Sequence, residues 1–199
     1  MTRALRFIIE NQPHHIVQRG HNRTKLFLDQ EDYRTYYYLL KKFSKDKTVL
    51  IYAYCLMINH VHLLIEPKKR ENLPFFMKRL NVSYAKYFNK KYQRTGSVFE
   101  SRYFSSPVET EQYLWTVCRY IEKNPVRTDG VENPTDFKWS SARFHMDLRG
   151  DDLIQEPLWK LPHEKMAYRS FLMEKEDPDH INFINNATNR NEWIGRIPK

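Results

Sequence analysis

The chain has 199 residues, 41% of them hydrophobic, which is enough for one domain, or one domain with an appendage, around an apolar core. It has no run of roughly 18 apolar residues, no signal-peptide pattern and no Cys-x-x-Cys pair, so we expect a cytoplasmic protein without a membrane span, a disulfide framework or a cysteine zinc site. A formal net charge of +9 favours an anionic partner, most often nucleic acid, although some proteins are basic without binding one.

Residues 1–108 contain six predicted elements in the order strand, helix, strand, strand, helix, strand. A strand over 14–19 ends at Gly20, and Asp29 is a suitable N-cap for a helix that continues to about Lys45. The other elements are strands over 49–57 and 60–66, an amphipathic helix over 73–92 and a strand over 102–108, in which Pro107 predicts an edge or end position. This is the order of the split βαβ, ferredoxin-like fold. We therefore predict an α+β (βαββαβ) domain with a four-stranded antiparallel sheet, both helices on one face and a helix from later in the chain on the other.

His60 and His62 lie on the second strand of the predicted hairpin. Because side chains alternate along a strand, both imidazoles point to one face, about 7 Å apart, and could hold one divalent metal ion. A pair of half-buried histidines without a metal is an equally ordinary interpretation, since short His-x-His patterns recur by chance. The pair therefore needs support from elsewhere in the chain.

That support comes from a predicted helix over residues 110–124, which carries Tyr120 and Asn124. Thr110 can cap this helix, and Pro125 disfavours its continuation. Residues four apart lie on the same helix surface, so Tyr120 could supply a nucleophile and Asn124 a third metal ligand. Of the 13 tyrosines, only Tyr120 is followed four positions later by a possible ligand. The alternative is an ordinary tyrosine at the edge of the core and an asparagine near a helix end.

Six short motifs, in order along the chain, resemble those of one protein family. They are residues 19–23 (RGHNR), 54–64 (YCLMINHVHLL), 85–89 (AKYFN), 96–103 (GSVFESRY), 119–127 (RYIEKNPVR) and 139–141 (WSS). The set resembles the single-tyrosine HUH transposases, in which U is a hydrophobic residue. It is most similar to the REP-associated tyrosine transposases, bacterial relatives linked to repetitive extragenic palindromes. Asn124 suits that branch, because the mobile-element branch often has Gln there. The resemblance covers about residues 5–145, the expected transposase domain.

The resemblance implies that His60, His62 and Asn124 bind Mg²⁺ or Mn²⁺, and that Tyr120 attacks the scissile phosphate to leave a 5′-phosphotyrosine. It implies a single-stranded DNA substrate with a hairpin, strand transfer without a nucleotide cofactor, a nucleoid-associated location and a monomer rather than a dimer. Nine basic or polar residues are candidate DNA contacts. They are Arg19, Asn22, Arg23, Lys78, Arg79, Lys86, Lys90, Arg94 and Arg102.

Two other functions compete with the strand transferase. A domesticated regulator would bind hairpin DNA with little or no cleavage. A metal-dependent hydrolase on a similar fold would release a free 5′-phosphate and form no tyrosine adduct. A covalent adduct between protein and DNA distinguishes the first hypothesis from both of these.

Residues 146–199 match the family poorly and form a predicted C-terminal extension. Acidic residues outnumber basic ones after residue 144, whereas the positive charge lies before it. Pro157, Trp159 and Tyr168 belong to a predicted short helix with a docking surface, and the Asn-rich end over residues 182–199 is predicted to be extended. We hypothesise that the extension packs near the active site or the DNA and regulates access.

Overall fold

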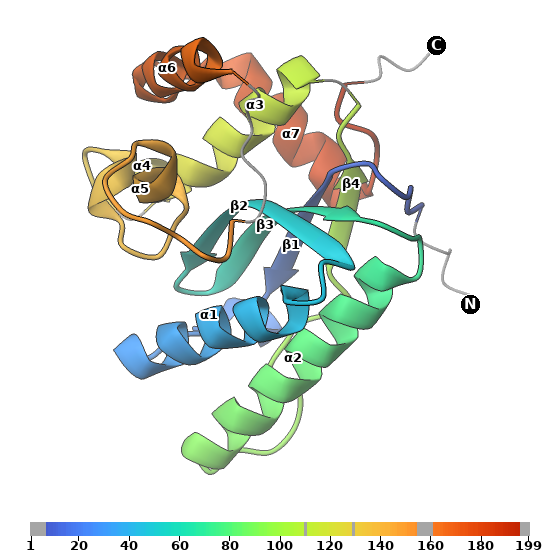
Figure 1. The fold of residues 1–199 in the computed structure, drawn as a ribbon. Helices are drawn as coiled ribbons and strands as arrows, with labels where there is room; N and C mark the ends of the chain where they lie inside the picture. Colours follow the sequence, from blue (N-terminus) through green and yellow to red (C-terminus); the bar gives the residue numbers. More distant parts are fainter. Residues whose placement is uncertain (1–6, 110, 129, 155–160, 196–199) are drawn as a thin grey trace.

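A single antiparallel sheet of four strands organises the protein, whose computed structural model describes residues 7–109, 111–128, 130–154 and 161–195. The strands are β1 (His14–Arg19), β2 (Val49–Met57), β3 (His60–Pro67) and β4 (Phe104–Pro107), in the spatial order β2-β3-β1-β4. Helices α1 (Gln30–Ser44) and α2 (Asn72–Lys91) cover one face of the sheet (Figure 1). The predicted ferredoxin-like α+β fold is therefore confirmed.

The helices of the second half of the chain lie on the other side of the sheet (Figure 1). They are α3 (Glu111–Glu122), α4 (Asn124–Thr128), α5 (Ala142–His145), α6 (Pro162–Met173) and α7 (Pro178–Arg190). Two short 3₁₀ turns, η1 (His21–Arg23) and η2 (Pro134–Asp136), complete the described structure. Among the described helices, none is both long and apolar enough to cross a bilayer.

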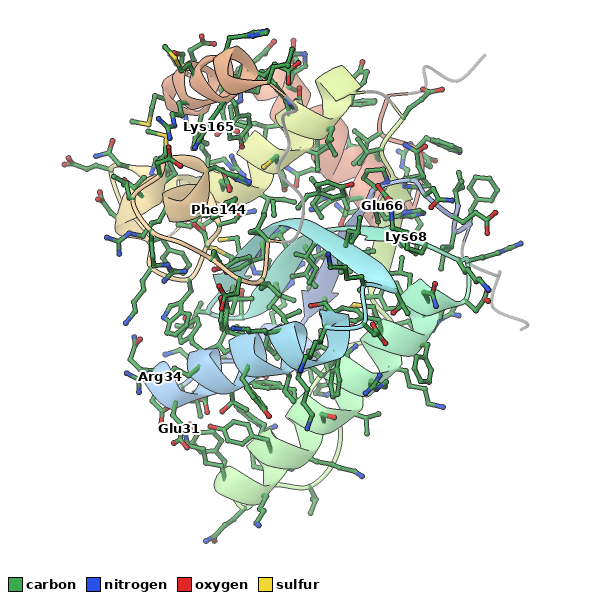
Figure 2. All side chains as sticks on the ribbon, in the orientation of Figure 1. Glu31, Arg34, Glu66, Lys68, Phe144 and Lys165 are labelled. Atoms are coloured by element: carbon green, nitrogen blue, oxygen red, sulfur yellow. The ribbon has the colours of Figure 1, made fainter. Side chains whose placement is uncertain are left out.

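The sheet has an apolar core on each face, because alternate side chains of its strands point in opposite directions. One core joins Leu63 and Ile65 of β3 to Tyr84 of α2. The other joins Leu64 of β3 to Ile121 of α3 and to residues of α6 and α7. Side chains fill the space between the sheet and the helices on both sides (Figure 2). The helix predicted for this other face is α3, and it packs there together with α6 and α7.

The limits of the predicted elements are close to the observed ones, with two informative differences. Asp29 caps α1 as expected, since its carboxylate accepts hydrogen bonds from the backbone N–H groups of Glu31 and Asp32. The fourth strand is shorter than predicted and, as Pro107 indicated, lies at the edge of the sheet. The helix predicted to reach residue 124 ends at residue 122, and α4 begins at residue 124. Pro125 breaks the helix because it has no N–H group, but it is compatible with the first turn of the next one. The predicted cap Thr110 lies outside the described residues.

The prediction of an extended chain over residues 182–199 is wrong as far as residue 190, because α7 occupies that region. Asp177 caps α7 by accepting a hydrogen bond from the N–H of Asp179. Ile184 and Ala187 then bury their side chains in the second core. This burial outweighs the low helix propensity of the asparagines. The predicted docking residues Pro157 and Trp159 lie outside the described residues.

Candidate active site

The two histidines of β3 face a pocket on the side of the sheet that α3 and α7 cover (Figure 1). The pocket has a volume of about 440 Å³ and is open to solvent at one side. Four segments line it: β1 and the turn after it, β3, the junction of α3 with α4, and α7. The lining residues are Val17, Arg19, Arg23, Asn59, His60, His62, Tyr120, Asn124, Arg127, Thr128, Ile181, Asn185, Thr188 and Asn189.

His60 and His62 point to the same face, as strand alternation predicted, and their ring centroids are 4.8 Å apart. His60 Nδ1 lies 2.6 Å from the side-chain oxygen of Asn59. Since an amide oxygen only accepts, His60 carries its proton on Nδ1 and leaves a lone pair on Nε2. His62 Nε2 lies 2.9 Å from Nδ2 of Asn124. The Asn124 amide donates there, so His62 also has its lone pair on Nε2.

Both imidazoles are uncharged at neutral pH. Burial lowers the pKa of His60 to about 4, with a smaller contribution from the nearby Arg19. Burial also lowers the pKa of His62 well below its ordinary value, and the neighbouring His60 and His15 act in the same direction. The neutral form is the one that binds metal ions.

The residues around this pair fit a divalent metal ion. Two imidazole nitrogens and a carboxamide oxygen are suitable donors, and arginines in the pocket suit an anionic substrate that would supply oxygen ligands. In this structure Asn124 presents Nδ2 to His62. A half-turn of the carboxamide would present its oxygen in the same place. The tertiary structure therefore brings His62 and Asn124 together, 62 residues apart in sequence.

Tyr120 lies in the same pocket, with its ring centroid 5.8 Å from that of His62. Its hydroxyl donates a hydrogen bond of 2.6 Å to Oδ1 of Asn185 in α7. Burial raises the pKa of the Tyr120 hydroxyl, and the positive charge of Arg127 partly offsets this. The guanidinium of Arg127 lies 4.5 Å from the centre of the tyrosine ring. The phenol is thus protonated and held by α7 in this structure.

Arg127 belongs to the site, although the sequence did not single it out. One of its nitrogens donates a hydrogen bond of 2.5 Å to the backbone carbonyl of Tyr120. Another lies 2.6 Å from the carboxylate of Glu176, just before α7. The spacing of seven residues after Tyr120, two helical turns, was the signal that could have identified it.

Three residues outside the predicted catalytic set also hold the site together. His15 on β1 lies 2.9 Å from His62, through Nε2 and Nδ1 respectively. Asn185 and Thr188 reach the pocket from α7. Alternation along β1 could have indicated that His15 shares a face with Arg19, but nothing local in the sequence indicates that α7 docks here.

The nine predicted DNA contacts do not form one surface. Arg19 and Arg23 line the pocket of the histidines. Lys78 and Arg102 line a separate hollow of about 540 Å³ between α2 and the segment before β4. Of the remaining five, Arg79, Lys86 and Lys90 lie on α2, Arg94 follows α2, and Asn22 lies in the turn after β1. Since α2 covers the opposite face of the sheet, its basic residues are separated from the histidines by the sheet itself (Figure 1).

A second group of possible metal ligands is buried where α3 meets α5. Donor atoms of Cys118, Glu122 and His145 lie within 4.8 Å of one another, so this group could hold a metal ion. Glu122 already accepts hydrogen bonds from Ser141 (2.5 Å) and Tyr168 (3.0 Å), and lies 2.6 Å from Nδ1 of His145. The contacts tie α3 to α5 and α6. Because Glu122 lies between Tyr120 and Asn124 in sequence, this group supports the part of the backbone that carries them.

Comparisons with known proteins agree with this geometry. Residues 9–124, more than half of the chain, match the family model described as "Transposase IS200 like". A Haemophilus influenzae protein assigned as a REP-associated tyrosine transposase is 27% identical over 143 residues, covering 65% of this chain and 78% of that protein.

Two solved structures are also similar. A REP-associated tyrosine transposase bound to a REP hairpin superimposes with a TM-score of 0.63 and 17% identity, covering 81% of this chain and 96% of that one. A Deinococcus radiodurans protein assigned as a transposase gives a TM-score of 0.42 and 18% identity, covering 62% of this chain and 97% of that one. The first of these likenesses shows a shared fold.

Proposed function

The chain belongs to the IS200-like transposase family, as its motifs predicted, and on that premise we propose that it is a metal-dependent endonuclease and strand transferase for single-stranded DNA that contains a hairpin. The observation that carries the proposal is the meeting of His62, Asn124 and Tyr120 in one basic pocket. The REP hairpin bound by the structural relative supports the choice of DNA. Such a substrate would place the protein in the cytoplasm, with the nucleoid.

The metal ion would be held by His60, His62 and Asn124. Both imidazoles are neutral and carry their lone pairs on Nε2, which is the state a ligand needs. When bound, Mg²⁺ or Mn²⁺ would act as a Lewis acid on the scissile phosphate. The chain's own part is to keep both rings in the right tautomer and orientation.

Tyr120 would be the nucleophile. Its oxygen forms a bond to phosphorus, the bond from phosphorus to the 3′ oxygen breaks, and that oxygen takes up a proton to become a 3′-hydroxyl. The phenol must lose its proton during attack, and the amide oxygen of Asn185 is too weak a base to accept it. Water in the open pocket would relay this proton toward the leaving 3′ oxygen, which takes one up, so that the protons balance. The phosphotyrosine keeps the energy of the phosphodiester, so the 3′-hydroxyl of another strand can reverse the reaction.

The positive charges of the pocket would bind the phosphates around the cleavage point. Arg19, Arg23 and Arg127 all line it. Phosphate contacts of this kind supply affinity without sequence preference. The other predicted contacts, on α2 and around the second hollow, would serve the hairpin only where it extends beyond the pocket.

We propose that the extension from residue 146 onward regulates access to the nucleophile, while residues 5–145 form the transposase domain. Three contacts support this role. Asn185 accepts from the Tyr120 hydroxyl, Glu176 pairs with Arg127, and Asn189 accepts a hydrogen bond of 2.9 Å from Arg19. We also propose that the monomer is the active unit, since Tyr120 and Asn124 line the same pocket as the two histidines of their own chain.

The test is a covalent adduct on a single-stranded hairpin substrate with Mg²⁺ or Mn²⁺. Wild-type protein should give a band of slower mobility in denaturing gels, and Tyr120→Phe should give none. Tyr113→Phe is the matched control, because Tyr113 lies on the same helix and packs against Phe183 instead. An adduct that persists in Tyr120→Phe would refute the assignment. Hairpin binding without any adduct would favour the domesticated regulator, and free 5′-phosphate without an adduct would favour the hydrolase.

A further inference from the structure

A third histidine, His15, contacts His62, one of the two proposed histidine ligands, but has no role in the chemistry proposed above. The register of β1 against β3 places Val17 opposite His62 and His15 opposite Leu64, so His15 and His62 are diagonal neighbours on one face. Their ring planes differ by 10° and their centroids are 5.2 Å apart. Imidazole N–H groups and lone pairs lie in the ring plane, so this near-coplanar arrangement suits a hydrogen bond between the rings.

Both nitrogens of His15 have partners, and the side chain is fully buried. Nε2 lies 2.9 Å from Nδ1 of His62, and Nδ1 lies 2.9 Å from the hydroxyl oxygen of Thr188 in α7. The contacts form a chain that begins at Asn124, passes through two histidines and ends at Thr188. The protons along such a chain of hydrogen bonds can be arranged in only two ways: each group donates either toward Thr188 or toward Asn124.

The donor at the start of the chain selects one order. Asn124 directs Nδ2 at Nε2 of His62, so that nitrogen accepts and the proton of neutral His62 is on Nδ1. His62 Nδ1 then donates to Nε2 of His15, and His15 Nδ1 donates to Thr188. The opposite order would place an N–H of His62 against the N–H group of Asn124. It would also protonate the nitrogen that a metal ion needs.

We propose that His15 is a positioning residue, which holds His62 in the tautomer whose Nε2 can bind a metal ion, and that Thr188 orients His15 for this task. This inference rests on the proposed function in one respect only, the identity of His62 as a ligand. It gives α7 a second role, because the helix that restrains Tyr120 also completes the support of the metal site. Partners of metal-binding histidines commonly act in this way.

Two measurements test the proposal, and the first needs no metal. In ¹⁵N NMR spectra of the metal-free protein, His62 should be the Nδ1–H tautomer in wild type. This preference should weaken in His15→Leu, because only the Asn124 amide then favours it. The second is Mn²⁺ affinity, followed by EPR without DNA, which should fall about 10- to 100-fold in His15→Leu. His15→Gln should restore most of it, because its amide oxygen can accept from His62. Thr188→Val should cause a smaller loss in the same direction.

A matched control separates positioning from general stability. His14 is as buried as His15, but its Nδ1 bonds to the carbonyl of Gln12 and it lies on the other face of β1. His14→Gln should therefore lower the melting temperature without changing Mn²⁺ affinity or the His62 tautomer.

Three outcomes decide the matter. If His15→Leu folds and changes neither the His62 tautomer nor the Mn²⁺ affinity, the proposal is overturned. If His15→Leu does not fold, the same two measurements on Thr188→Val and His15→Gln decide the proposal. If Mn²⁺ binding to the wild-type protein is absent, or is the same in His60→Ala, the metal assignment fails. The tautomer measurement still decides the role of His15 in that case.

Discussion

Replacing Asn185 with alanine tests whether α7 restrains the proposed nucleophile. The substitution removes the acceptor of the 2.6 Å hydrogen bond from the Tyr120 hydroxyl. If that bond must break before the phenol attacks, it stabilises the resting state alone. A hydrogen bond of this kind contributes about 0.5–1.5 kcal/mol net. Since 1.36 kcal/mol corresponds to a tenfold change in rate, adduct formation should become about 2- to 13-fold faster.

The assay is the single-turnover rate of adduct formation on a single-stranded hairpin with saturating Mn²⁺. Asn186→Ala is the matched control, because Asn186 is the next residue of α7 and its side chain is exposed. Its rate should equal that of wild type. A slower rate in Asn185→Ala, with hairpin affinity unchanged, would refute the reasoning, since it would mean that Asn185 aligns the phenol for attack. Point variants are the right test here, because removal of the whole extension would also remove Tyr168 and Ile184 from the second core.

Three further predictions concern the framework of the site. Burial alone would raise the pKa of Asp32, but hydrogen bonds to its carboxylate outweigh burial and lower it. The contribution of the Asp32 carboxylate to stability should therefore be present above the unfolded pKa of about 3.9 and disappear as the pH falls further. In urea unfolding, Asp32→Ala should cost about 3 kcal/mol at pH 7 but much less at pH 2. Glu122→Ala should also cost about 3 kcal/mol, because it removes the buried carboxylate that Ser141, His145 and Tyr168 all contact, and an unchanged urea midpoint would contradict this. Gly20→Ala should lower the free energy of unfolding by about 1–3 kcal/mol and weaken hairpin binding, because the added Cβ would clash with the carbonyl oxygen of Thr24. Gly150→Ala is the control, since a Cβ there meets no atom within 4 Å. Thermal melts and gel shifts should show no change in that variant.

The local features of the fold and site were accessible from the sequence because they depend on neighbouring residues. Alternation along a strand is sufficient to place His60 and His62 on one face. Helical spacing relates Tyr120 to Asn124 even though the helix breaks between them. The order of six elements limits the topology to very few sheets, and the observed sheet is the expected one.

The basic residues show where local reasoning stops. Lys86 and Lys90 follow a clear polar stripe of α2, and their positive charge was reason enough to place them among DNA contacts. Which face of the sheet α2 covers depends on where its apolar stripe packs, and that is the face opposite the histidines. Charge in a sequence therefore identifies a type of partner, whereas the arrangement of layers decides which charges can act together.

By itself, the sequence determined the βαββαβ order, the shared direction of the two β3 histidines and the one-turn relation of Tyr120 to Asn124, because each follows from a repeat of two or about four residues. Only the tertiary structure decided that His15 meets His62, and that Asn185 of α7 meets Tyr120. Those contacts join residues 47 and 65 positions apart. They depend on strand register and on the burial of an apolar helix face, which the whole chain settles together rather than any local pattern.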